Sequence, residues 1–215
     1  MTTPSHPGRA LHDPLRRILH LDVLLHRQRL VLFFAFCLHS ACAQSYPETV
    51  KVLLPDKEHA ELYNPTFIIR WKAVADGIFY DVILKNLFDE ELLKIETSAN
   101  SIDVDWRNPK IADADALLVE VQIKGNGNSK SPPNLVKKLS TKARAVIDKL
   151  ISAAPNVIKE ENARGKLARA VFYEEHHLLI DALTAYEYAI SLADTPEYRA
   201  AYKAFLVKNK MDDDE

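Results

Sequence analysis

Cysteine is almost absent from this chain. Of its 215 residues only Cys37 and Cys42 carry a thiol, and both lie within the first 43 residues. If that segment is removed, the remaining chain can form no disulfide, hold no metal through cysteine and use no cysteine nucleophile. A chain without thiols suits an oxidising compartment, although this feature alone does not assign one.

The chain also lacks an excess of basic residues. It holds 28 Lys and Arg against 30 Asp and Glu, and residues 1–43 contribute five arginines and only two acids. Without that segment 23 basic and 28 acidic residues remain, which gives a net charge near −5. Binding to nucleic acid needs a basic face that neutralises phosphates, so we expect no nucleic acid partner.

Motifs of catalysis are missing as well. The sequence has no Gly-x-Ser-x-Gly elbow, and residues 125–128 lack the Lys-Ser/Thr pair of a phosphate-binding loop, so a hairpin connection is expected there. His176 and His177 are adjacent, and adjacent helical side chains point about 100° apart, which favours a solvated turn over a metal pair. The acidic pairs at 160–161 and 174–175 are typical of a solvated face. We predict a protein that is not an enzyme and that holds no metal or cofactor.

The N-terminal segment has the order of residues found in export signals. Arg27 and Arg29 precede the apolar run 30–38, and the small residues Ala41 and Ala43 follow it. Such a run is too short to cross about 30 Å of hydrocarbon, whereas an Ala-x-Ala sequence fits the pocket of a signal peptidase. This order predicts a cleaved secretory signal and no transmembrane span in the mature chain.

Cleavage is expected after Ala43, so that residues 1–43 are the signal and Gln44 begins the mature chain. A competing interpretation is a lipid anchor on Cys42, but lipidation requires an aliphatic side chain at the position that His39 occupies. A buried helix at the start of a globular domain is a further alternative. The expected location is the periplasm or outer envelope of a Gram-negative type of cell.

Residues 46–139 carry the pattern of antiparallel strands, in which short apolar runs are separated by turn residues. In the run 116–124, apolar side chains at the odd positions alternate with more polar ones at the even positions. Leu117, Val119, Val121 and Ile123 are therefore expected to face the core, and the other face to be wet. The expected strands are Val50–Leu54, Thr66–Trp71, Ile78–Leu84, Leu92–Thr97, Ser101–Val104, Ala116–Lys124 and Leu135–Ser140.

Three stretches of this half match a known type of sandwich. They are Ile69-Arg70-Trp71, the strand at 78–84, and the strand at 118–124 that runs into Gly125-Asn126-Gly127-Asn128. On these residues the segment resembles a fibronectin type III domain, an immunoglobulin-like fold. The resemblance implies a sandwich whose centre is filled by Trp71 and that serves as a spacer or binding module. The core residues we expect are Trp71, Tyr80, Val119 and Val121.

After Ser140 the apolar period becomes helical. The helix at 142–153 carries one apolar stripe and ends before Pro155, and Asp194-Thr195 can cap the last helix. The stripe consists of Val146, Ile147, Leu150 and Ile151. Further helices are expected at Asn162–Glu175, Leu178–Ala193 and Pro196–Lys210.

Two of these helices carry alanines and tyrosines at regular spacing, and a leucine lies at the turn between them. The set comprises Ala170, Tyr173, Leu178, Ala182, Tyr186 and Ala189. With these residues the segment between Leu167 and Ala193 resembles a single tetratricopeptide repeat, in which alanines let two antiparallel helices approach closely. One repeat is not self-sufficient, so either the neighbouring helices cap it or a partner protein supplies the next repeat.

The expected fold class is α+β. An antiparallel β-sandwich of the fibronectin type III or immunoglobulin type at 46–139 is followed by a small helical domain resembling a tetratricopeptide repeat at 140–211. Residues 212–215 form an acidic tail. These features predict an exported, non-enzymatic protein-binding or scaffold protein of the cell envelope or periplasm.

Two alternatives remain. One is an extracytoplasmic accessory or sensor module of a signalling system. The other is a surface glycan-binding module, which predicts exposed aromatic side chains on the sandwich, for which the candidates are Phe79, Tyr80 and Phe88.

Overall fold

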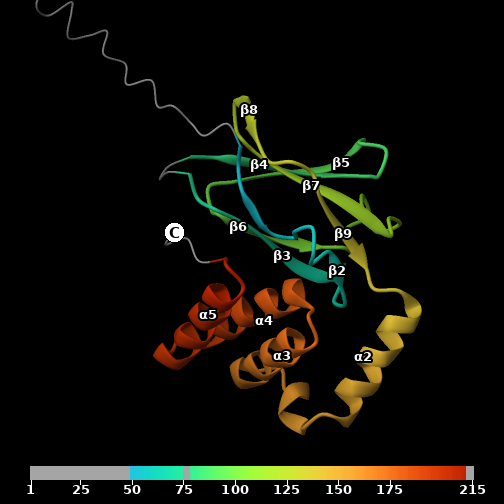
Figure 1. The fold of residues 1–215 in the computed structure, drawn as a ribbon, viewed down its shortest axis with the longest axis vertical. Helices are drawn as coiled ribbons and strands as arrows, with labels where there is room; N and C mark the ends of the chain where they lie inside the picture. The colour runs from blue at the N-terminus through green and yellow to red at the C-terminus, as the bar shows by residue number, and fades with distance from the viewer. Residues whose placement is uncertain (1–48, 75–77, 212–215) are drawn as a thin grey trace, which may run out of the picture. The chain divides into compact units, whose positions relative to one another are not determined.

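The computed structural model describes residues 49–74 and 78–211, which belong to one compact unit. Within these residues two β-sheets precede four α-helices, and the chain therefore has the mixed α+β class expected (Figure 1). The strands are β1 (Val52–Leu54), β2 (Glu61–Leu62), β3 (Thr66–Trp71), β4 (Tyr80–Lys85), β5 (Glu91–Thr97), β6 (Ser101–Asp105), β7 (Ala116–Ile123), β8 (Asn126–Lys130) and β9 (Asn134–Lys138). The helices are α2 (Thr141–Ala153), the short 3₁₀ helix η1 (Asn156–Lys159), α3 (Ala163–Glu175), α4 (Leu179–Leu192) and α5 (Pro196–Lys208).

The two sheets differ in size and pairing. The smaller sheet has the order β1-β3-β6 and is antiparallel throughout. The larger has the order β2-β9-β7-β4-β5, with β8 paired to β7, and its β2–β9 pair is parallel. The larger sheet is therefore mixed, where the sequence pattern predicted only antiparallel strands.

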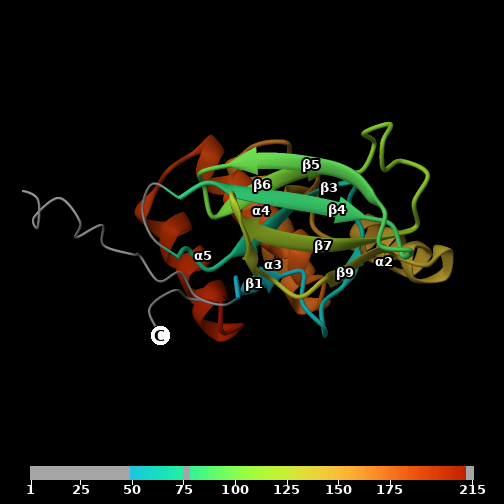
Figure 2. The same cartoon turned by 90° about the horizontal axis from the view of Figure 1, so that it is seen from above.

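Apolar side chains from both sheets form a common core. In the larger sheet β5, β4 and β7 run side by side, as Figure 2 shows. Trp71 of β3 and Tyr80 of β4 come from different sheets, and their rings meet edge to face with centroids 5.3 Å apart. The odd-numbered side chains of β7 from Leu117 to Ile123 are all buried, as their alternation predicted. This period of two fixes which face of β7 is turned inward.

The opposite face of the larger sheet is polar, but it is not uniformly wet. Glu120 of β7 is buried, although the sequence placed it on the solvent side. The ammonium groups of Lys85 and Lys130 lie 3.4 and 3.5 Å from its carboxylate. Asp81 on the neighbouring strand is buried in the same way, with Lys94 at 2.8 Å. These ion pairs join residues of neighbouring strands, so a strand pattern alone does not reveal them.

Three of the four described α-helices begin at a residue whose side chain caps the first turn, whereas α4 begins without such a cap. Ser140, Asn162 and Thr195 each accept a hydrogen bond from a backbone N–H group in the first turn of α2, α3 and α5. Pro196 occupies the first turn of α5, where its missing N–H group costs nothing. The last helix ends at Lys208, two residues before the expected end.

Helix α4 is the centre of the helical part. It packs against α3, α5 and β3, and most of its side chains are buried (Figure 1). By contrast, Ile147 is the only buried residue of α2. Its neighbours on the predicted apolar stripe, Val146 and Leu150, are 54% and 38% exposed. The stripe of α2 is thus only partly covered.

No helix in the described ranges is both long enough and apolar enough to cross a membrane.

Candidate functional site

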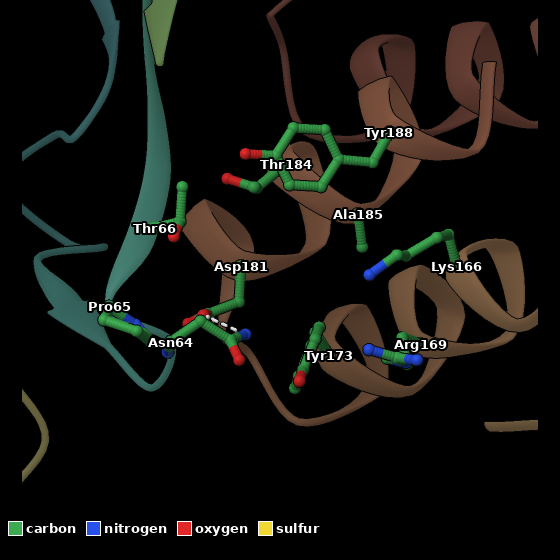
Figure 3. Close-up of a pocket in the computed structure, with 10 residues that line it drawn as sticks. All are labelled: Asn64, Pro65, Thr66, Lys166, Arg169, Tyr173, Asp181, Thr184, Ala185 and Tyr188. Atoms are coloured by element: carbon green, nitrogen blue, oxygen red, sulfur yellow. Dashed lines mark hydrogen bonds between the residues drawn. The ribbon is translucent and has the colours of Figure 1, made fainter. Parts of the chain in front are cut away.

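The loop between β2 and β3 is held by a buried carboxylate of α4. Asp181 is 1% exposed. It accepts hydrogen bonds from the backbone N–H groups of Tyr63 and Asn64, both at 2.8 Å, and from the Asn64 side-chain amide at 2.7 Å. Figure 3 shows Asn64 beside Asp181. We call this arrangement the Asp181 clasp. It joins the sheet region to the helices through polar contacts.

Two opposing effects act on the charge of Asp181. Burial disfavours the ionised form and raises the pKa of Asp181 to about 6. The N–H donors of Tyr63 and Asn64 and the positive charge of Arg144 favour the ionised form and limit the rise. The carboxyl therefore changes its charge closer to neutral pH than an exposed aspartate does.

Helices α2 and α3 hold the same loop from its other side. Arg144 of α2 donates a hydrogen bond to the Tyr63 carbonyl oxygen, and its guanidinium carbon lies 4.8 Å from the centre of the Tyr63 ring. The Tyr63 hydroxyl donates to Asp148 at 2.6 Å. The ring of Tyr173 from α3 lies 5.9 Å from the Tyr63 ring. Burial and the neighbouring Asp148 raise the pKa of the Tyr63 hydroxyl, so it stays protonated as a donor.

A small cavity of about 150 Å³ lies beside the clasp. Figure 3 shows side chains from α3, α4 and the β2–β3 segment converging on it. Its lining consists of Asn64, Pro65, Thr66, Lys166, Arg169, Tyr173, Asp181, Thr184, Ala185 and Tyr188. Charged and aromatic groups around a cavity are typical of functional sites, so the partners of these groups decide what the cavity can bind.

The polar groups around this cavity bind other parts of the protein. Thr184 accepts from the Ile68 N–H at 2.9 Å and donates to a carbonyl of its own helix. Arg169 donates to the carbonyl oxygens of Ile158 at 2.8 Å and Glu160 at 2.7 Å. Lys166 pairs with Glu161 at 2.8 Å. Because these donors and acceptors are already satisfied, the cavity is best described as part of the structural junction.

The three histidines within the described ranges lie around one groove of about 480 Å³. His59 comes from the segment before β2, whereas His176 and His177 come from the α3–α4 turn. Sequence reasoning did not bring them together, because more than a hundred residues separate them. The Nδ1 atom of His59 lies 3.0 Å from an oxygen of Asp56.

The histidine groove is also lined by two lysines and two glutamates. Its lining contains no serine, threonine or cysteine that an imidazole could activate. In the part of the chain that the structure describes, no group of three or more His, Cys, Asp or Glu residues could hold a metal ion.

The residues predicted to form the two cores are buried in the structure. Trp71, Tyr80, Val119 and Val121 lie in the core of the sheets. The set expected to pack two helices together is also buried, at the α3–α4 pair and its turn: Ala170, Tyr173, Leu178, Ala182, Tyr186 and Ala189. The expected cleavage residues Ala41, Ala43 and Gln44, and the alternative lipidation residue Cys42, lie outside the described residues.

The aromatic candidates for glycan binding do not form one surface. Tyr80 is buried, which corrects its place among the exposed aromatics. Phe79 and Phe88 are 51% and 85% exposed, but Phe79 precedes β4 and Phe88 follows it. The two rings therefore lie at opposite ends of a strand, too far apart for one sugar to stack on both.

No family model matches the chain, and no curated protein is significantly similar to it in sequence.

Proposed function

We propose that this protein is an exported, non-enzymatic scaffold of the cell envelope or periplasm that binds another protein through its helical part. In this proposal the sheets form a spacer of the fibronectin type III kind. Helices α3 and α4 form a unit like a single tetratricopeptide repeat, supported by the buried alanines and tyrosines between them. Such a unit is normally one of several stacked neighbours.

The observation that carries the proposal is the uncovered stripe of α2. Val146 and Leu150 are four residues apart, so they lie on the same face of the helix. They are 54% and 38% exposed, whereas Ile147 beside them is buried. A helix that leaves part of its apolar face in water is suited to bind a second helix.

The charges around the stripe indicate the kind of partner. Lys142 and Lys149 are exposed on α2, and the first turn of this helix has no acidic residue to balance them. An amphipathic helix whose apolar face is flanked by Asp and Glu would match both the stripe and these charges. The proposed partner is a protein that presents such a helix.

A pull-down with matched variants tests the binding surface. The full chain, its V146S/L150S variant and the control variant V207S are each used to capture proteins from an envelope extract. Val207 of α5 is 54% exposed, as is Val146, but lies away from the stripe. The proposal expects a protein that wild type and V207S retain and V146S/L150S loses. An identical set of captured proteins for all three would contradict it.

The export part of the proposal has a separate test. Mass spectrometry of the mature N-terminus from the native cell is expected to find Gln44 as the first residue. An acylated Cys42 would indicate a membrane anchor instead, and a chain recovered from cytosol with residues 1–43 attached would refute export.

A further inference from the structure

A second cavity, of about 440 Å³, lies between the sheet region and the first turns of α2. Its volume is within the range of about 300–1,000 Å³ that is typical of small-molecule sites. The lining includes three basic side chains, Arg107, Lys138 and Arg144, and no acidic one. This one-sided charge is unexpected in a chain that holds more acidic than basic residues.

The wall of this cavity offers apolar surface beside the positive charge. Trp106 and Leu62 line it, and both are almost fully buried within the protein. The indole N–H of Trp106 donates to the Ala114 carbonyl oxygen at 2.9 Å. Because Trp106 is 2% exposed and Lys138 lies over its ring, the apolar surface open to a ligand comes mainly from Pro65 and Ala112, which also line the cavity.

Neutral groups hold two of the cations in place. Lys138 lies 5.2 Å from the centre of the Trp106 ring and donates to the Ala112 carbonyl oxygen at 3.0 Å. Arg144 rests on the Tyr63 ring and donates to the Tyr63 carbonyl oxygen. Within residues 49–74 and 78–211, neither cation forms an ion pair with a carboxylate. The charge of Arg144 acts on Asp181, but Asp181 does not line this cavity.

Arg107 behaves differently from these two. It forms an ion pair with Asp105 at 2.8 Å and is mostly exposed. Its charge is therefore already compensated, and Arg107 marks the rim of the cavity. Lys138 and Arg144 remain as the pair of oriented cations that an incoming anion could neutralise.

We propose that this cavity binds a small organic anion with an apolar body, such as an arylacetate or a branched-chain carboxylate. The carboxylate would lie near Lys138 and Arg144, and the apolar body would lie against Pro65 and Ala112. An inorganic anion would satisfy the charges but leave the apolar wall uncovered, so it would bind more weakly.

Isothermal titration calorimetry, which measures the affinity for each of several defined ligands, tests this site. The carboxylates are phenylacetate, indole-3-acetate and 4-methylpentanoate, and the comparison ligands are phenylacetamide, acetate and inorganic phosphate. We expect at least one of the three carboxylates to saturate a single site. Its uncharged or smaller counterparts should bind about tenfold more weakly or worse, because they lack either the charge or the apolar body.

Variants of the cavity provide the second part of the test. K138Q should weaken binding of the best carboxylate about tenfold, and K138R should retain most of it. K51Q is the matched control, since Lys51 is exposed and does not line the cavity. It removes the same charge and should leave the affinity unchanged.

A measurement on the wild-type protein avoids any dependence on how the variants fold. The chain holds two tryptophans, Trp71 in the core and Trp106 in the cavity wall. Addition of the ligand should shift the indole N–H resonance of Trp106 and leave that of Trp71 in place.

Several outcomes would overturn the proposal. They are the absence of saturable binding for all three carboxylates, equal affinity in wild type and K138Q, a shift of the Trp71 resonance alone, or binding of phosphate or acetate as tight as that of the best carboxylate. Each can occur whether or not the α2 stripe binds a protein, so the two proposals fail independently.

Discussion

The carboxylate of Asp181 binds both the backbone and the side-chain amide of Asn64, a residue 117 positions earlier in the chain. This contact joins the first turn of α4 to the loop that enters β3. The arrangement of helices and sheets therefore depends on a buried polar group as well as on apolar contacts.

Replacement of this carboxylate should be costly. Asp181→Ala would leave the N–H groups of Tyr63 and Asn64 without their acceptor in a buried place, and we expect the free energy of unfolding to fall by about 3 kcal/mol or more. Urea denaturation followed by circular dichroism measures this loss. Asp194→Ala, at an exposed aspartate, is the control and should change stability by less than about 1 kcal/mol. Similar effects of the two changes would show that the clasp contributes little.

The same residue predicts a pH effect of defined sign. The pKa of Asp181 is about 6 in the folded protein and near its ordinary value of 3.8 when unfolded, so the folded state binds its proton more tightly. The resulting stabilisation is complete below about pH 4 and is lost as the pH rises through 6. A difference of this size corresponds to about 3 kcal/mol.

This pH effect is measured as the stability of wild type minus that of Asp181→Asn, from urea titrations between pH 4 and pH 8. Wild type should lose stability relative to Asp181→Asn as the pH rises. Contributions from other carboxyls, such as Asp81 with its lowered pKa, are common to both proteins and cancel. A constant difference across this range would mean that the N–H donors fully offset the burial of the charge.

Replacement of Gly165 in the first turn of α3 by alanine should destabilise the protein, although the same replacement usually stabilises a helix. A β-carbon added there would lie 2.0 Å from the Glu160 carbonyl oxygen. Alanine commonly stabilises a helix by about 1 kcal/mol relative to glycine, but this contact requires the backbone to move. We expect Gly165→Ala to destabilise the protein by about 2 kcal/mol.

Gly127 is the matched control for this change. A β-carbon at Gly127 would meet no atom within 4 Å, so Gly127→Ala should alter the melting temperature little. A Gly165→Ala protein as stable as wild type would mean that the segment before α3 can shift at no cost.

Phe205 anchors α5 on α4. Its ring centroid lies 5.0 Å from that of Tyr186, and the side chain is buried. We expect Phe205→Ala to lower the free energy of unfolding by about 3–5 kcal/mol through the cavity that it leaves. The control is Phe88→Ala, at a side chain 85% exposed, which should change stability by less than about 1 kcal/mol. Equal losses would show that α5 contributes little to the fold.

Much of the fold was predictable because patterns of neighbouring residues in the sequence determine its strands and helices. Strand Thr66–Trp71 was expected at its observed bounds, and the alternation in β7 identified its buried face. The expected cap at Asp194-Thr195 located the start of α5, since an N-cap needs only its own side chain and the following turn.

Elements without such a pattern were missed. Strand β2 has two residues, too few to show an alternation. Strand β8 contains only polar and glycine residues, because it continues a hairpin rather than covering the core. The expected hairpin connection at 125–128 is shorter in the structure, where β8 already begins at Asn126.

The sites were less predictable than the fold, because they depend on residues far apart in the sequence. Asp181 has the position of an ordinary acid in the first turn of a helix, and nothing nearby predicts its contact with Asn64. Trp106, Lys138 and Arg144 come from separate elements, so only the tertiary structure brings them to one cavity.

Only Leu139 and Ser140 separate the end of β9 from the start of α2. Because Leu139 is buried and Ser140 caps the helix, this connection is short and both of its residues are held in place. A force that acts on α2 would therefore also act on β9, which lies between β2 and β7. The hydrogen bonds that join β9 to β2 and β7 would oppose a force that pulls on α2.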